Sequence, residues 1–440
     1  MDKRLRIFCS ILCVSLTTAV SSPALASAAS DPLLADQWAL ADPGVLGAEE
    51  AWTQSSGAGV VVAVLDTGVQ LDHPDLAGNI WTNAGEIAGN GVDDDHNSVI
   101  DDVHGANAFD RSADVEDGNG HGTHVAGIVA ARQGNGIGGS GLAPGAKIMP
   151  VKVLDANMSG TTDALAAGIR YAVDNGAKIL NVSVNTDTPA DALKSAVAYA
   201  GSKGAIIVAS AGNNGRNIDL LPSYPASLAD PAIFSVAAQT AGNVLWNLSN
   251  NGLLSVDLAA PGERIVSTAR GSGYQSRTGT SAAAPFVAAA LALLSAARPD
   301  MSMPALREAI AATTRKSNLL AKLLGSSGRL DVGAAMHQVV GANWKTSSAP
   351  VAATLRLKAP AKAKAGSKVT VRWSATGAET VAKWRVSLNG RVVKSLPAGK
   401  ARLAKRVART GRNQWRVVGF DEAGAKVVSG KRAFKVLRRG

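Results

Sequence analysis

Three segments of this 440-residue chain carry side chains that could act together as an orienting carboxylate, a general base and a nucleophile. Asp66 follows the apolar run GVVVAVL, His121 follows the run GNG, and Ser281 follows Gly279-Thr280 at the start of an Ala-rich run. A carboxylate can fix the tautomer of an imidazole, and that imidazole can then remove a proton from a hydroxyl. The three residue types therefore suit nucleophilic catalysis.

Each of these residues also has a plainer interpretation when it is taken alone. Asp66 could cap a turn, and Ser281 could be the N-cap of a helix. His121 and His124 could bind a metal as an i, i+3 pair, but no Glu lies between them as a metalloprotease helix requires. The presence of all three residues, each at the end of a structural element, favours catalysis.

The elements that would hold these residues alternate along residues 59–302. Short β-branched runs, among them GVVVAVLD, KIMPVKVL, AKILNVSV and GAIIVASA, alternate with helix-length Ala-rich segments such as TDALAAGIRYAVDNG. This spacing predicts βαβ units around a mostly parallel sheet with helices on both faces. Open α/β sheets build their sites at the carboxyl ends of the strands, which is where Asp66 would lie. We therefore expect an α/β domain.

The segments VLDTGV, HGTHVAG and GTSAAAP strongly resemble the three signature segments of the subtilisin-like serine peptidases, which share this Asp, His, Ser order. The resemblance covers about residues 37–340. It implies a subtilisin-like fold and a serine endopeptidase that works through an acyl-enzyme, with Asp66, His121 and Ser281 as the triad. It also matches Asn213, in ASAGNNG, to the amide that stabilises the oxyanion; a turn residue is the alternative. Because the base must be a neutral imidazole, activity should fall as the pH drops through about 6 to 7.

The same resemblance implies a substrate cleft. KVLDANMSGTT and NVSVNT match segments that pair with an extended substrate as added strands, and the implied cleft residues are Met158, Ser159, Gly160, Ser183 and Val184. The family usually has Gly where this chain has Asn185, a departure that would narrow a subsite or change the backbone pairing. Asp219 matches a position near the base of the primary specificity pocket, where a carboxylate would favour Lys or Arg before the scissile bond. A helix or turn cap is the alternative for Asp219.

An acidic segment, NGVDDDHNSVIDDV, offers oxygen ligands at alternate positions, as the first half of a calcium loop does. An EF-hand would have Gly at Ser98, so this is not one. The resemblance implies structural Ca²⁺ as the cofactor, because similar acidic insertions bind calcium in subtilisin-like enzymes, and Asp75 matches a further calcium position of the family. A solvated acidic loop is the alternative. The candidate ligands in the loop are Asp93, Asp95, Asn97, Asp101 and Asp102.

The chain begins with the pattern of a secretory signal. Lys3, Arg4 and Arg6 precede the apolar run IFCSILCVSLTTAV, small residues follow, and cleavage after Ala26 is expected. The run is too short to span a membrane comfortably, and no later stretch predicts a transmembrane helix. Both cysteines leave with this segment, so the mature protein would have no disulfide. We therefore expect a secreted protein, either extracellular, periplasmic or at the cell surface.

Charge divides the chain into two parts. Residues 351–440 carry 23 Lys and Arg against 3 Asp and Glu, whereas residues 1–350 carry 22 against 31. The basic part has short alternating segments, with Asn389-Gly390 as a hairpin signal, and predicts a small immunoglobulin- or fibronectin-like β-domain. The expected domains are a signal peptide (1–26), a peptidase domain (27–345), a linker (346–367) and a basic β-sandwich-like domain (368–440).

The positive charge of the β-domain exceeds what solubility requires. We expect this domain to bind anionic surfaces or polysaccharide in a salt-dependent manner, and it has no signature of sequence-specific nucleic-acid binding. Polypeptides are the expected substrates of the first domain. A second hypothesis is a binding protein in which the peptidase fold is only a scaffold, but the complete triad and Asn213 favour the peptidase. No prodomain fits before the catalytic domain, so calcium, the β-domain or a separate chaperone would assist folding.

Overall fold

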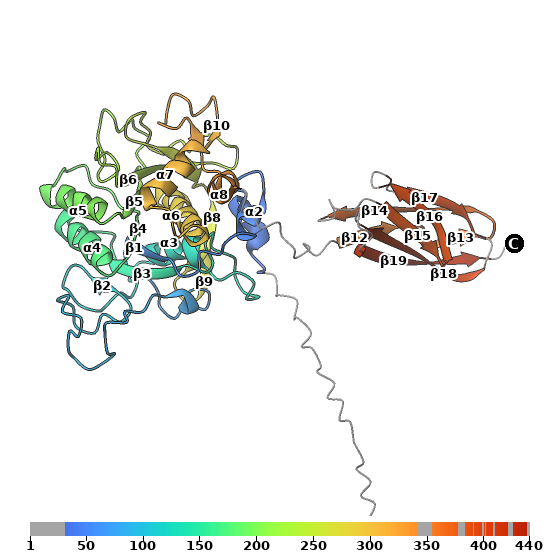
Figure 1. Ribbon diagram of the computed structural model, residues 1–440, viewed down its shortest axis with the longest axis horizontal. Coiled ribbons are helices and arrows are strands. Elements are labelled where there is room, and N and C mark those ends of the chain that lie inside the picture. The colour runs from blue at the N-terminus through green and yellow to red at the C-terminus, as the bar shows by residue number, and fades with distance from the viewer. Residues whose placement is uncertain are drawn as a thin grey trace, which may run out of the picture. The chain divides into compact units, whose positions relative to one another are not determined.

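A computed structural model describes residues 31–341 and, in the remainder, 354–376, 383–389, 391–397, 400, 402–407, 410–420 and 426–437. The chain divides into two units, Met1–Trp344 and Lys345–Gly440, whose helices and strands are labelled in Figure 1. The predicted signal peptide, residues 1–26, lies outside the described residues.

The first unit is built on a nine-stranded sheet with the strand order β10-β11-β7-β6-β5-β4-β1-β3-β2. All neighbouring strands are parallel except β10 and β11. The apolar runs that the sequence predicted as strands are the long parallel strands of this sheet. The bounds are β1 (Val61–Asp66), β2 (Ala106–Asn107), β3 (Lys147–Lys152), β4 (Ile179–Val182), β5 (Ile206–Ser210), β6 (Ile233–Gln239), β7 (Leu258–Pro261), β10 (Arg315–Lys316) and β11 (Gly328–Arg329).

Helices cover both faces of the sheet because successive strand residues point to opposite faces and both sets are apolar. In β1, Val62 and Val64 belong to a core with α3 and α6, whereas Ala63 and Leu65 belong to a core with α4 and α5. Figure 1 shows α4 and α5 side by side, apart from α6. The helices are α1 (Trp38–Ala41), α2 (Ala48–Trp52), α3 (His121–Ala130), α4 (Thr162–Asp174), α5 (Asp191–Ser202), α6 (Thr280–Ala297), α7 (Met303–Ala312) and α8 (Val332–Val340), with 3-10 helices at Leu34–Asp36 and Ala77–Asn79.

Helix α6 is the central helix of the first unit. It packs against α3 and against β4, β5, β6 and β7. Among the described residues it is the one helix long and apolar enough to cross a membrane, but most of it is buried inside the unit, as in the core helix of a globular domain.

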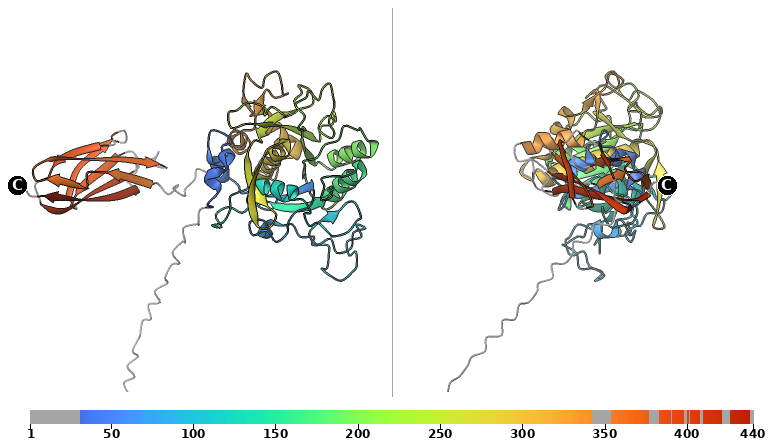
Figure 2. Two further views of the ribbon diagram at one scale, coloured as in Figure 1. Left: turned by 180° about the vertical axis from the view of Figure 1, so that it is seen from behind. Right: turned by 90° about the vertical axis from the view of Figure 1, so that its right-hand side faces the viewer.

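An antiparallel hairpin outside the main sheet leads into α6. Its strands are β8 (Ile265–Ala269) and β9 (Gly273–Arg277). β8 packs against α3, and Figure 2 shows the two elements from behind. The hairpin therefore lies between two helices: it precedes α6 in the chain, and its strand β8 packs against α3.

The second unit contains only strands among its described residues. A three-stranded sheet consists of β12 (Thr354–Lys358), β14 (Lys368–Thr376) and β17 (Arg402–Arg406). A five-stranded sheet consists of β13 (Lys362–Lys364), β15 (Lys383–Leu388), β16 (Arg391–Pro397), β18 (Gly411–Phe420) and β19 (Lys426–Leu437).

One apolar core joins the strands of the second unit. Trp373, Trp384 and Trp415 all belong to it. The predicted linker (346–367) is too long at its carboxyl end, because β12 and β13 lie within it. The Ala, Lys and Pro content of that segment favoured a linker. Its Leu355 and Leu357 instead pack against the core.

Candidate functional site

Asp66 and His121 form a direct hydrogen bond where β1 meets α3. His121 Nδ1 lies 2.7 Å from Asp66 Oδ1, with Asp66 fully buried and His121 only 7% exposed. The Thr67 N–H donates to the same carboxylate oxygen at 2.8 Å. Asp66 Oδ1 is thereby held by two hydrogen bonds, one to the His121 imidazole and one to the turn that follows β1.

The negative charge of Asp66 controls the pKa of His121. Burial lowers this pKa, but the charge of Asp66 and its hydrogen bond outweigh burial and raise the pKa above the ordinary 6.5, while Arg277 acts in the opposite direction. For His124, burial and the charge of Arg277 lower the pKa to about 3. His124 Nε2 lies 3.0 Å from the Ile265 carbonyl oxygen, so the two rings have different partners and do not form the alternative metal pair.

Asp117 fixes the first turn of α3 and was not predicted from the sequence. Its Oδ1 accepts the Gly120 N–H at 2.7 Å, and its Oδ2 accepts the N–H and the hydroxyl of Thr123 at 2.9 and 2.7 Å. Gly122 lets this turn approach β1, since a Cβ there would lie 2.0 Å from the Gly68 carbonyl oxygen. An acidic residue just before a helix is a capping signal that the sequence does contain.

Ser281 is the second residue of α6, and its carbonyl has a partner outside the helix. Pro285 lacks the N–H that would bond to the carbonyl four residues earlier, which is that of Ser281. The Ser183 hydroxyl donates to the Ser281 carbonyl oxygen at 3.1 Å instead, and Asn181 Nδ2 donates to Ser183 Oγ at 2.8 Å. The end of β4 is therefore tied to the backbone of the predicted nucleophile.

The Asn213 amide lies beside Ser281. Asn213 Oδ1 accepts the N–H and the hydroxyl of Thr280 at 2.8 and 2.9 Å. A Cβ at Gly279 would lie 3.3 Å from both Asn213 Nδ2 and Ser281 Oγ, so these two atoms flank the same glycine. Gly212 and Gly215, and not Asn213, have the positive φ of a turn. The amide N–H groups are thus available to an acceptor near Ser281 Oγ.

The predicted catalytic residues meet at one edge of the sheet. Asp66 ends β1, and Asn213 follows the end of the parallel strand β5. His121 and Ser281 begin α3 and α6, which pack against each other. The structure therefore brings four groups from four elements to the carboxyl ends of the strands. They are the Asp66 carboxylate, the His121 imidazole, the Ser281 hydroxyl and the Asn213 amide.

The two predicted cleft segments flank β1 at this same edge. Met158, Ser159 and Gly160 follow β3, and Ser183 and Val184 follow β4, the two neighbours of β1 in the sheet. The first segment is folded on Asp155, whose carboxylate accepts the Ser159 N–H at 2.9 Å. Its tip, Met158, is 41% exposed. An exposed segment at residues 158–160 and a largely buried one at residues 183–184, on either side of Asp66, can accommodate an extended chain.

The Asn185 side chain, which follows β4, forms hydrogen bonds to the last residue of the neighbouring strand β5. Its Nδ2 donates to the Ser210 carbonyl oxygen at 2.6 Å, and the Ser210 hydroxyl donates to its Oδ1 at 3.3 Å. Asn185 is exposed and Ser210 is buried, so the amide covers Ser210 from the solvent side. Ser210 ends β5, three residues before Asn213, so Asn185 is bonded to the strand that leads to the predicted oxyanion donor.

Asp219 has contacts that favour a role in loop structure over the expected role in substrate specificity. Its carboxylate accepts the N–H groups of Leu254, at 3.2 Å, and of Ser255, at 2.9 Å. No hydrogen bond among the described residues links this carboxylate to Ser183 or Asn213. The carboxylate instead joins two surface loops.

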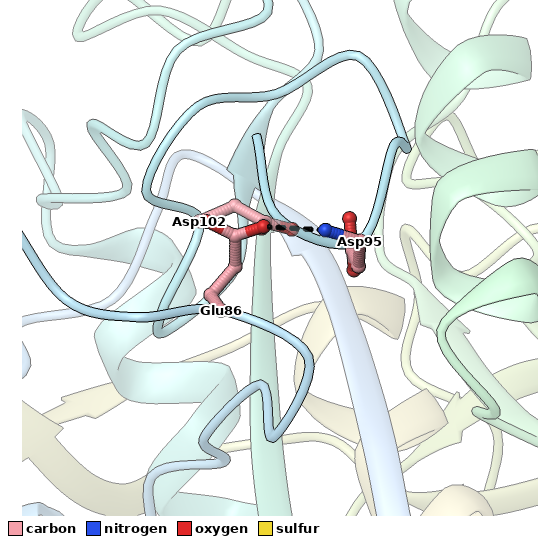
Figure 3. A group of neighbouring side chains, drawn as sticks. All are labelled: Glu86, Asp95 and Asp102. Atoms are coloured by element: carbon pink, nitrogen blue, oxygen red, sulfur yellow. Dashed lines mark hydrogen bonds between the residues drawn. The ribbon is translucent and has the colours of Figure 1, made fainter. Parts of the chain in front are cut away.

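The acidic loop brings Glu86, Asp95 and Asp102 together, with one carboxylate oxygen of each within 4.8 Å of the others (Figure 3). Glu86 precedes the acidic run and was not predicted as a ligand from the sequence. Asn97 belongs to this group, since its Nδ2 donates to Asp95 at 3.0 Å and to Asp102 at 2.9 Å. Burial raises the pKa of Asp102, against the hydrogen bonds that it accepts from Tyr171, Asn97 and Asn83. A set of hard oxygen donors with a buried carboxylate suits Ca²⁺.

The carboxylates of the other predicted metal ligands accept hydrogen bonds from other groups. Asp93 accepts the N–H groups of Asn97 and Ser98, and Asp101 accepts those of residues 89, 90 and 91. Asp75 lies near Asn135, whose Nδ2 donates to it at 2.7 Å. Asp93 and Asp101 thus stabilise the loop backbone, whereas Asp75 belongs to a separate polar cluster.

Comparisons with known proteins match the first unit. A model of the subtilase family matches residues 57–331. The chain is 39% identical over 274 residues to thermitase of Thermoactinomyces vulgaris, covering 62% of this chain and 88% of thermitase. It is 41% identical over 241 residues to the cell wall-associated protease of Bacillus subtilis, covering 55% of this chain and 24% of that protein. A solved structure of a protease from Pseudoalteromonas arctica matches with a TM-score of 0.60 at 29% identity, covering 71% of this chain and 100% of the other.

Proposed function

The chain belongs to the subtilase family and is a subtilisin-like serine endopeptidase acting on polypeptides, and we propose that Asp66, His121 and Ser281 catalyse hydrolysis through an acyl-enzyme. The observation that carries this assignment is the 2.7 Å hydrogen bond between His121 Nδ1 and the buried Asp66 carboxylate. This bond keeps the proton on Nδ1 and leaves Nε2 as the basic nitrogen.

The proposed reaction has two halves. His121 Nε2 removes the proton of Ser281 as Oγ attacks the substrate carbonyl carbon, and the Asn213 amide and the Ser281 N–H stabilise the oxyanion. The C–N bond then breaks, and His121 gives its proton to the leaving amine. In the second half, His121 removes a proton from water as the water oxygen attacks the acyl carbon; the C–Oγ bond then breaks, His121 returns the proton to Ser281 Oγ, and the carboxylic acid product is released. The raised pKa of His121 suits a residue that must also carry the proton.

Labelling with a fluorophosphonate probe tests this function. We expect the wild type to be labelled at Ser281 and to cleave protein substrates, and we expect Ser281→Ala to do neither. A folded wild-type protein that is neither labelled nor active would support the second hypothesis, in which the peptidase fold is only a scaffold for binding.

The proposed cleft binds the substrate between the segments at residues 158–160 and 183–184. Peptide hydrogen bonds to these two segments would hold the substrate extended across Asp66 and Ser281. Asn185 narrows the space for the side chain before the scissile bond, because its amide is bonded across to Ser210. We therefore propose a preference for small side chains at that position, in place of the Lys or Arg preference that Asp219 suggested.

Structural Ca²⁺ is the proposed cofactor of the acidic loop. Glu86, Asp95 and Asp102 would supply carboxylate oxygens, and Asn97 would add an amide oxygen by rotation of its side chain. Neutralising these mutually repelling carboxylates is the chemistry that the ion would supply. Asp75, which the family resemblance implies as a calcium ligand, would form a second site, and Asn135 is bonded to its carboxylate.

Secretion is proposed from the signal pattern at residues 1–26. The name of the similar Bacillus subtilis protein, cell wall-associated protease, places that relative outside the cytoplasm. Amino-terminal sequencing of the exported protein tests this proposal, with Ser27 as the expected first residue.

The second unit is proposed to be an immunoglobulin- or fibronectin-like sandwich that attaches the enzyme to an anionic partner. Its two sheets and shared tryptophan core support the sandwich. Its 23 Lys and Arg against 3 Asp and Glu support the anionic partner. The unit lies outside the residues matched by the family model, so this role is independent of the peptidase chemistry.

A further inference from the structure

The outer face of the three-stranded sheet in the second unit carries only neutral or cationic side chains among the described residues. Along β14, Val369, Val371 and Trp373 are buried, whereas Lys368 and Arg372 are exposed. This alternation is that of a strand with one face in a core and one in solvent. Among its described side chains the outer face has no large apolar residue, so charge and hydrogen bonding are its means of recognition.

The register of the strands gathers the cations into two rows. Arg372 lies opposite Lys358 of β12 on one side and opposite Arg402 of β17 on the other. Lys368 lies opposite Arg406, four residues away along β14, which corresponds to about 13 Å. All five of these side chains are exposed. We call the two rows, Lys358-Arg372-Arg402 and Lys368-Arg406, the cationic face.

Small side chains separate the two rows. Thr370 lies opposite Ala404 between them. The middle of the cationic face is therefore shallow, and an extended polymer lying along the strands could contact a row of cations at each end.

The cationic face is unfavourable for the isolated protein. Like charges directly opposite each other on neighbouring strands destabilise a sheet, and this face has three such pairs. None of the five cations forms an ion pair with a carboxylate in the described part of the unit. The unit's acidic residues, Glu379, Asp421 and Glu422, lie outside the described residues. The repulsion would be relieved by an anionic partner bound on the face.

We infer that the cationic face binds an acidic polysaccharide bearing carboxylate groups, an inference that rests on the anionic partner proposed above. Arg372 and Arg402 can each bind a carboxylate with two parallel hydrogen bonds. Binding to a single-stranded nucleic acid would use exposed aromatic rings, but Trp373, Trp384 and Trp415 are buried. Insertion into a lipid surface would use exposed apolar anchors, which the described residues of this face lack.

Binding of the full-length chain to immobilised alginate, a linear polymer of uronic acids, tests this inference. All chains carry Ser281→Ala to prevent self-digestion. The test variant, Lys358→Gln/Arg372→Gln/Arg402→Gln, removes one row of the cationic face. The matched control, Lys383→Gln/Arg416→Gln/Lys435→Gln, removes the same charge from exposed positions of the five-stranded sheet. At 0.15 M salt we expect the test variant to bind about tenfold more weakly or worse, and the control to change less than about threefold.

Two further measurements make the test decisive. Arg372→Lys keeps the charge but loses the planar guanidinium, so it should weaken binding without affecting folding, even if the triple variant is unstable. Equal losses in the test and control variants would refute the cationic face as the site. Tighter binding to a DNA duplex or to phosphatidylglycerol vesicles than to alginate would refute the polysaccharide but leave the anionic partner standing. Binding to none of the three probes would refute both proposals, and Ser281 labelling of the active enzyme is independent of each outcome.

Discussion

Replacing Asn185 by Gly should widen the preference for the residue before the scissile bond. The Asn185 amide spans the ends of β4 and β5 through its bonds to Ser210. Glycine removes the amide and opens space at the ends of β4 and β5, beside the proposed cleft. A Leu or Phe side chain of the substrate could then be buried in that space.

The expected size of this effect follows from burial of the substrate side chain. Complete burial of a Leu or Phe side chain is worth about 1.5 to 3 kcal/mol, which corresponds to about a 10- to 150-fold increase in kcat/KM. Loss of the Asn185 hydrogen bonds opposes this gain by about 1 kcal/mol, but that loss acts on all substrates alike. We therefore expect the ratio of kcat/KM for Leu to that for Ala to rise by about tenfold or more in Asn185→Gly.

The assay uses peptides that differ only in having Ala, Leu or Phe before the scissile bond. Active-site titration with a fluorophosphonate corrects for the folded fraction. Asn175→Gly, at the end of α4 on the opposite edge of the sheet, is the matched control and should leave the ratio unchanged. A Leu-to-Ala ratio in Asn185→Gly within about threefold of the wild-type ratio would refute the role of Asn185, because even partial burial should exceed it.

Three other predictions concern the catalytic residues and the metal. Because Asp66 raises the pKa of His121, the wild-type kcat/KM should fall as the pH drops through a value above 6.5, where the imidazole gains its proton. Asp66→Asn should lower kcat about 10⁴-fold and move that fall to lower pH, since burial then dominates; a pH profile that does not move would contradict this. Asn213→Ala should lower kcat about 10²- to 10³-fold with little change in KM, and a change confined to KM would exclude an oxyanion role. EDTA should lower the unfolding temperature of the wild type, since calcium at 100 times its Kd adds about 2.7 kcal/mol of stability, and Asp102→Asn should reduce this response; an unchanged melting temperature in EDTA would count against structural calcium.

The sequence predicted those parts of the site that local patterns determine. Asp66 could be placed because an apolar run ends at it, and a parallel strand presents its last residue at the edge where sites form. His121 and Ser281 could be placed because each lies at the start of an apolar helix, His121 directly after Gly120 and Ser281 after Gly279-Thr280. The three motif segments were therefore sufficient to predict both the fold and the candidate catalytic residues.

Contacts between distant segments could not be predicted in the same way. Glu86 joins Asp95 and Asp102 only after the acidic loop folds back on itself, whereas the alternating pattern suggested Asp93 and Asp101. These two carboxylates accept backbone N–H groups, which tight turns supply at short range. The loop contact of Asp219 likewise depends on a segment about 35 residues away in the sequence, and no local pattern reveals it.

Pro285 removes one backbone hydrogen bond from α6 close to the predicted nucleophile. A proline inside a helix is unfavourable by about 3 kcal/mol, yet the acceptor that it leaves free is the carbonyl of Ser281, and Ser183 occupies it. Ser183 also lies in the segment proposed to bind the substrate. Movement of that segment when a substrate docks would therefore reach the backbone of the nucleophile through a single hydrogen bond, so that substrate recognition and the alignment of Ser281 are mechanically coupled.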